Sequence, residues 1–161
     1  MKSSLDSLLS QFVALPCWGV VAGKGTGSMV SLDFGDKIPR DRPLSNIHLS
    51  EDCRNNSSEC SIFIQHSSWL LEQGDKEVCS CDSDNSNAGA MVKGLRRLIG
   101  MHVHHVEYIP KQGLYIDFQS DFTLSIFFDA LENYGEGFAN ATLFITGVEA
   151  SVAGEGVLKI S

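Results

Sequence analysis

GLYIDFQSDFTLSIFF, the stretch Gly113–Phe128, alternates apolar and polar residues in two successive runs. Apolar residues occupy every second position from Leu114 to Phe118 and again from Phe122 to Phe128, with the polar Gln119–Asp121 between the runs. A period of two is typical of a strand with one buried face. Two such runs joined by a short polar break predict a β-hairpin. We therefore expect this hairpin to lie at the centre of the core.

The hairpin has a counterpart in the first half of the chain, with a shared Asp-Phe step. The matched segments are Ser31–Ile38 with Tyr115–Phe122, Cys60–Gln65 with Leu124–Asp129, and Trp69–Leu71 with Leu143–Ile145. A repeat of this strand–strand–strand unit, over 28–81 and 113–146, would bury two half-cores against each other. The alternative is that two amphipathic hairpins resemble each other without any duplication, and both interpretations stay open. The core is expected to contain Leu32, Phe34, Ile62, Ile64, Ile116, Phe118, Leu124 and Ile126.

The first copy carries an insert, roughly 39–59, that is rich in Asp, Asn, Ser, Arg and Pro. Inserts of that length in compact domains are usually functional or mobile. Residues 52–58 contain almost nothing to bury, so little offsets their conformational entropy. We predict that they form the most mobile internal loop of the chain.

Two helices are expected beside the strands. Residues 4–13 place apolar side chains on one helical stripe, and residues 88–99 do the same, with Asn85 or Asn87 as the N-cap and Gly100 after the C-terminus. The sequence therefore predicts one α+β domain over 1–161. It would be mostly antiparallel β with two helices packed on the sheet, and would contain two similar hairpin-based halves if the repeat is real.

Composition favours an ordinary globular protein. The chain has 161 residues, of which 43% are hydrophobic and 20% charged. Neither a membrane-spanning apolar run nor the apolar core of a signal peptide is evident, so we expect a cytoplasmic protein without membrane association. The five cysteines are odd in number and scattered, which suits reduced thiols.

The net charge of the chain indicates which classes of partner it could bind. The net charge of −8 disfavours nucleic-acid binding, whose footprint is basic. The same charge favours a basic protein partner through steering and complementarity. An assembly of identical chains is also compatible with the sequence.

The strongest candidate metal ligands are His102 and His104, which would face the same way on a regular strand. A third ligand would have to come from another part of the chain. Asp33 and Asp117 occupy equivalent positions in the two matched copies, and would form an acid/base pair if a pseudo-two-fold axis brought them together. In each case the alternative is a polar residue on a solvated strand face.

No nucleophilic elbow and no cysteine in a known catalytic context is present, and no cofactor motif is complete. We therefore assign no catalytic residue and expect no cofactor.

Several short patterns carry a family resemblance. They are the Ile62–Leu71 segment, Val78–Ser80 with the following Asp/Asn loop, the helix end Leu95–Gly100, the Leu114–Phe118 hairpin strand and Glu132–Tyr134. From these, the region from about 28 to 146 resembles a group of small uncharacterised bacterial proteins. That resemblance implies no assigned activity and transfers no catalytic residues. In type and size such acidic proteins are similar to the immunity proteins of toxin–antitoxin loci.

Two hypotheses follow. The first is a non-enzymatic binding module, of the immunity-type inhibitor kind, that covers a basic partner with exposed acidic residues of the insert and of the Asp/Asn loop. Those residues are Asp36, Asp41, Glu51, Asp52, Asp82 and Asp84. The alternative is a small metal-binding protein or enzyme that uses His102 with His104 and Asp33 with Asp117.

Overall fold

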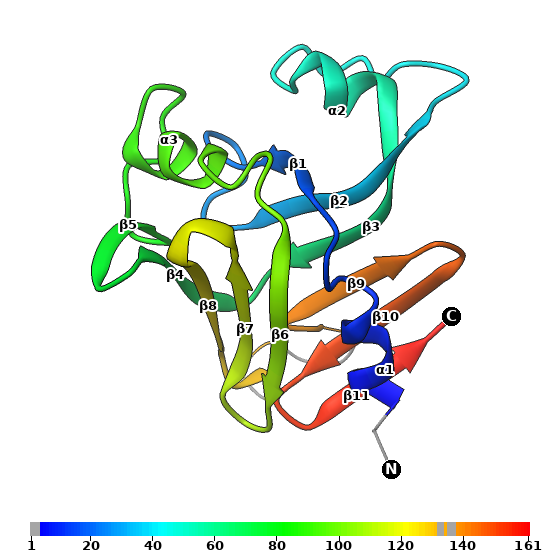
Figure 1. Ribbon diagram of the computed structural model, residues 1–161, viewed down its shortest axis with the longest axis vertical. Helices are drawn as coiled ribbons and strands as arrows, with labels where there is room; N and C mark the ends of the chain where they lie inside the picture. The colour runs from blue at the N-terminus through cyan, green and yellow to red at the C-terminus, as the bar shows by residue number, and fades with distance from the viewer. Residues whose placement is uncertain (1–3, 132–133, 135–137) are drawn as a thin grey trace.

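The computed structural model describes residues 4–131, 134 and 138–161, and within them the strands form two antiparallel sheets (Figure 1). The six-stranded sheet has the order β1 (Cys17–Val21), β2 (Val30–Pro39), β3 (Asn56–Ile64), β9 (Ala141–Ile145), β10 (Val148–Ala153), β11 (Gly156–Ile160). The five-stranded sheet has the order β5 (Lys76–Ser80), β4 (Ser67–Gln73), β8 (Phe122–Phe128), β7 (Gly113–Phe118), β6 (Val103–Ile109). The expected α+β class, mostly antiparallel, is confirmed.

The central hairpin is formed by β7 and β8, with the short 3-10 helix η1 (Gln119–Asp121) between them. All eight residues of the expected core belong to one buried cluster and are at most 2% exposed. Both sheets contribute to this cluster, and Phe34 of β2 stacks on Phe118 of β7 with ring centroids 6.3 Å apart. The alternation in the sequence therefore assigned the buried faces correctly.

Both expected helices are present but shorter than predicted. The first, α1 (Ser4–Ser10), gives way to tight turns, and Val13 is 41% exposed because the chain turns away there. The later helix, α3 (Ala90–Arg96), begins after Gly89 and not after an asparagine cap. No described helix is long and apolar enough to cross a membrane.

The prediction of a mobile loop over 52–58 is wrong, because these residues form the helix α2 (Glu51–Asn55) and the start of β3. The hydroxyl of Ser50 caps α2 by accepting a hydrogen bond from the backbone N–H of Cys53 at 3.2 Å, and the Cys53 side chain is 5% exposed. Arg54 also exchanges hydrogen bonds with the backbone of Leu44. A short cap and one buried side chain order a segment whose composition is otherwise polar.

The two halves exchange one strand each. After β3 the chain crosses to the other sheet, where β4 pairs with β8, and after β8 it crosses back, where β9 pairs with β3. The order β1-β2-β3-β9-β10 therefore corresponds to the order β6-β7-β8-β4-β5. The matched segments keep their register in this exchange: Cys60 pairs with Ile145 as Leu124 pairs with Leu71.

An isolated bridge between Pro16 and His102 joins the starts of β1 and β6, where an axis relating the halves would pass. The pairing of Cys17 with Phe34 corresponds to that of Val103 with Phe118, and each is followed by a register shift. The two halves are thus topologically equivalent, although the β2–β3 and β7–β8 hairpins differ in register. A duplication of the sequence itself stays a prediction.

Candidate functional site

The predicted partner-binding residues lie in two groups at one end of the molecule, the upper end in Figure 1, where α2 and α3 lie. All six are exposed: Asp36, Asp41, Glu51 and Asp52 around α2, and Asp82 and Asp84 between β5 and α3. The group around α2 is mixed in charge, because residues 36–59 contain five acidic and four basic side chains. Lys37 forms an ion pair with Asp52 at 3.0 Å. In the other group, hydrogen bonds from Ser86 lower the pKa of Asp84.

The structure brings no third metal ligand from the described residues to His102 and His104. A register shift between Val103 and His105 makes His104 the extra residue of a bulge, so the strict alternation on which the prediction rested is broken. The ring of His102 already contacts the carbonyl oxygen of Ala14, with Nδ1 2.9 Å away. Within the described residues, no group of three His, Cys, Asp or Glu side chains is placed to hold a metal ion.

Asp33 and Asp117 occupy equivalent positions but do not meet. Their strand neighbours are buried in the shared core, so the two carboxylates point away from it on the outer faces of different sheets. Each accepts a hydrogen bond on its own sheet, Asp33 from the hydroxyl of Ser58 at 2.8 Å and Asp117 from that of Thr123 at 2.9 Å. The proposed acid/base pair is therefore wrong.

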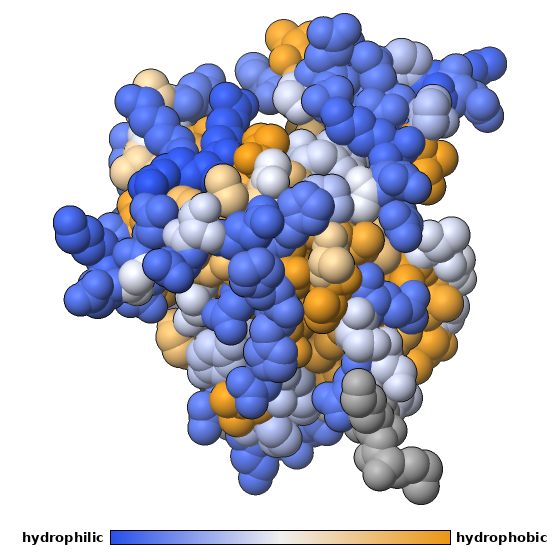
Figure 2. Space-filling model, viewed as in Figure 1, coloured by the Kyte–Doolittle hydropathy of each residue, from blue (hydrophilic) through white to orange (hydrophobic). Residues whose placement is uncertain are grey.

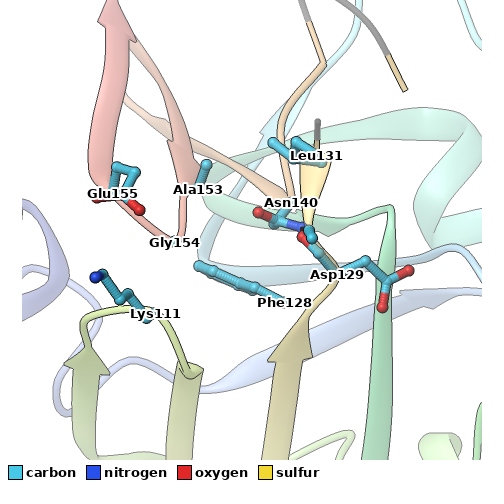
Figure 3. A pocket seen from close by; sticks show the side chains of 9 residues that line it. Lys111, Phe128, Asp129, Leu131, Asn140, Ala153, Gly154 and Glu155 are labelled. Carbon is cyan, nitrogen blue, oxygen red and sulfur yellow. Dashed lines mark hydrogen bonds between the residues drawn. The ribbon is translucent and has the colours of Figure 1, made fainter. Parts of the chain in front are cut away.

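A pocket of about 520 Å³ opens at the other end of the molecule, where the β6–β7 and β10–β11 turns meet the start of the β8–β9 connection. The two turns are joined by a hydrogen bond from the backbone N–H of Lys111 to the carbonyl of Gly154, 2.8 Å long. In Figure 3, Lys111 and Glu155 lie on one side of the pocket, Asn140 on the other, and the Phe128 ring lies between them. The pocket thus combines an aromatic ring with three polar side chains.

Asn140 is the most constrained of these residues. It is 0% exposed, and its Nδ2 donates hydrogen bonds to the carbonyls of His66 at 2.7 Å and Asp129 at 2.9 Å. Among the residues that the structure describes, none donates a hydrogen bond to its Oδ1, which faces the pocket (Figure 3). Buried polar atoms normally find partners, so this acceptor marks the pocket as a place for a donor group.

A cluster of three rings, two of them exposed, is here called the aromatic cluster and consists of His66, Tyr134 and Phe138. The His66 ring lies 4.5 Å from that of Tyr134 and 5.0 Å from that of Phe138. Tyr134 is 40% and Phe138 is 42% exposed. The Tyr134 hydroxyl donates to Asp129 at 3.2 Å, and this bond to a carboxylate raises the pKa of Tyr134. Asn140 and Asp129 thereby connect the aromatic cluster to the pocket.

The sequence analysis did not predict a site in this region. The signal lies in the comparison of the two halves: β3 is joined to β4 through Gln65 and His66 alone, whereas twelve residues, 129–140, join β8 to β9. Two residues suffice for the crossing from β3 to β4, so the β8–β9 connection is longer than such a crossing requires. Long connections are often functional. Of the motif Glu132–Tyr134, Glu132 and Asn133 lie outside the described residues.

Hydropathy distinguishes the parts of the surface. In Figure 2 the elements around α2 and α3 are mostly hydrophilic, whereas apolar residues gather over β9 and β10.

Comparisons with protein-family models, with curated proteins and with solved structures found no match. The function is therefore inferred from the site alone.

Proposed function

We propose that this protein is a non-enzymatic binding module for a basic protein partner, of the immunity-type inhibitor kind. The observation that carries the proposal is the aromatic cluster. Two of its rings are more than a third exposed although they contact each other, with centroids 6.1 Å apart. Aromatic residues are enriched at protein interfaces, where they bury a large area at low entropic cost.

The distribution of charge supports a basic partner. Residues 103–161 contain eight acidic and two basic side chains, whereas residues 1–102 contain twelve acidic and ten basic ones. Three quarters of the net negative charge, −6 of −8, therefore belongs to the part of the chain that supplies Tyr134, Phe138 and the pocket. Such an imbalance accelerates association with a cationic surface and orients it.

The acidic residues around α2 and α3 are a second candidate surface for the same function. Asp36, Asp41, Glu51, Asp52, Asp82 and Asp84 are all exposed, but basic side chains accompany those near α2. We therefore rank the aromatic cluster first and treat this acidic set as the comparison surface in the experiment.

The test is affinity capture from the source cell's lysate with three baits: the unaltered chain, a Tyr134→Ser/Phe138→Ser variant, and an Asp36→Asn/Asp82→Asn variant. The proposal expects a basic protein that the first and third baits retain and the second loses, with retention falling as salt rises. Loss only with the third bait would move the interface to the acidic set.

Capture of no basic protein by the unaltered chain would contradict the proposal. The inhibitor role has its own measurement. Expression of the captured protein alone should arrest growth, and co-expression with the unaltered chain, but not with the second bait, should restore it. A captured protein that is harmless by itself would exclude the inhibitor role while leaving the binding role intact.

A further inference from the structure

We propose that the pocket between Lys111, Phe128 and Asn140 receives the guanidinium group of an arginine side chain. The chemistry of the pocket supports a cationic group. The assignment of this group to a protein partner rests on the function proposed above. The pocket would then hold the anchoring residue of the partner, beside the aromatic cluster.

The orientation of the Asn140 amide is fixed by its surroundings. Nδ2 donates to two carbonyl oxygens, those of His66 and Asp129. Rotating the amide by half a turn would place Oδ1 against both carbonyls and lose both hydrogen bonds. Oδ1 is therefore the atom that faces the pocket, and only a group with an N–H or O–H can pair with it.

Two further groups favour a cation over a neutral donor. The Phe128 ring lies along the pocket in Figure 3, and the face of an aromatic ring attracts cations. The side chain of Glu155 lines the same space. Its negative charge acts on the neighbouring Tyr108 hydroxyl, because burial and the Glu155 carboxylate together raise the pKa of Tyr108. The Asp129 carboxylate points away from the pocket (Figure 3) and accepts a hydrogen bond from the Tyr134 hydroxyl.

Arginine fits this combination better than lysine. Its planar guanidinium carries five N–H donors and stacks on aromatic faces, so it can donate to Oδ1 while it lies against the Phe128 ring, with the Glu155 carboxylate across the same pocket. The volume of about 520 Å³ lies within the range of ligand pockets. The positive charge of Lys111 repels a bound cation. Removing this charge should therefore strengthen the binding of a cation, which can be tested.

The experiment is an NMR titration of the full chain with Nα-acetyl-arginine amide. Nα-acetyl-citrulline amide, nearly isosteric but uncharged, and Nα-acetyl-glutamate amide serve as comparison probes. We expect the arginine probe to shift the side-chain amide signal of Asn140 and the backbone signal of Phe128 at lower concentration than either comparison probe. Tighter binding of the glutamate probe, equal binding of the citrulline probe, or no shift at Asn140 would each overturn the proposal.

Charge variants give the second readout. Glu155→Gln should weaken binding of the arginine probe about two- to fivefold, and Lys111→Gln should strengthen it by a similar factor, as for exposed ion pairs. Glu149→Gln and Lys159→Gln make the same charge changes on exposed residues that do not line this pocket, and should leave the affinity unchanged. Equal effects of the pocket and control variants would overturn the assignment.

Failure of this inference can be distinguished from failure of the proposed function. If a basic partner is captured and Glu155→Gln and Lys111→Gln do not alter its retention, the pocket is not the anchor and the binding role stands. If the arginine probe binds as described but no basic partner is captured, the pocket assignment stands and the protein-binding role fails.

Discussion

Asp33 is a half-buried carboxylate in the middle of β2. Burial raises its pKa above 3.8, while the hydrogen bond from Ser58 and the charge of Arg40 act in the opposite direction. The folded protein therefore holds the Asp33 proton more tightly than the unfolded chain does. The stability associated with this proton is present below the unfolded pKa and is lost as the pH rises through the folded one.

Replacing Asp33 with Asn should therefore stabilise the protein at neutral pH. Asparagine keeps an acceptor for Ser58 but carries no charge, so its advantage over Asp33 should be larger at pH 7 than at pH 3.5. Urea unfolding at the two pH values measures the difference. Ser58→Ala provides a second variant: without its hydrogen bond the pKa of Asp33 should rise further, and the loss of stability should extend to higher pH. A stability gain from Asp33→Asn that does not change with pH would contradict this account.

The cysteines offer a second prediction at this scale. Burial raises the pKa of Cys17 to about 12 and those of Cys60 and Cys79 to about 11. The thiolate is the reactive form, so these thiols should resist iodoacetamide at pH 8 in the native protein. Cys81 is half-buried and should be modified first. Peptide mass spectrometry identifies the modified residue, and alkylation of Cys17 before Cys81 would show that the core opens more readily than the packing implies.

Candidate site residues were harder to predict than core residues. His102 and His104 were singled out by residue type and spacing, but a bulge at His104 changed the geometry. Asn140 was not singled out, because nothing local distinguishes it from other asparagines. Its importance arises from two carbonyls, one of them on the distant His66, that fix its amide. Such a role depends on tertiary contacts that a linear pattern does not contain.

Individual strands are the elements that the sequence predicted best. Alternation fixed which side of β7 and β8 is buried, since only one face of each strand meets the core. The short helix α2 was missed because five residues are too few for a helical period, and its signals are one serine cap and one buried cysteine. Register shifts were equally hidden, since a bulge depends on the partner strand.

The buried face of β7 can be tested with a matched pair of substitutions. Ile116 is 0% exposed, whereas Ile47, in the stretch between β2 and α2, is 77% exposed. Ile116→Ala should reduce the free energy of unfolding by about 2–5 kcal/mol through lost burial and the remaining cavity. Ile47→Ala removes the same atoms from the surface and should change it by no more than about 0.5 kcal/mol. Similar losses for both variants in denaturant unfolding would contradict the assigned core.

At the scale of the whole molecule, the exchange of β4 and β9 was not predictable from the alternation. The matched segments indicated three-strand units, and the simplest arrangement would pair all three strands of a unit in one sheet. Instead β4 pairs with β8 and β9 with β3. Alternation states which face of a strand is buried but not which strand lies beside it, so several pairings satisfy the same pattern.

This exchange makes each half of the chain dependent on the other. Without β9, the inner edge of β3 would be open, and without β4 the same would hold for β8. Unpaired strand edges expose backbone donors and acceptors and favour association with another chain. A cut between Asn87 and Ala88, both exposed in the loop before α3, would separate the halves without breaking a strand.

We therefore expect fragments 1–87 and 88–161, expressed separately, to remain unfolded or to self-associate, and to regain the fold when mixed. Size-exclusion chromatography should show a one-to-one complex. Its amide NMR spectrum should match that of the intact chain except near the cut, because β4 and β9 can pair with their usual neighbours across the two fragments. The control is a mixture in which the first fragment carries Trp69→Asp. This mixture should not regain the fold, since Trp69 is 1% exposed on the exchanged strand β4. A folded, monomeric spectrum from either fragment alone would show that its sheet is complete without the exchanged strand, which the pairing of β4 with β8 and of β9 with β3 does not allow.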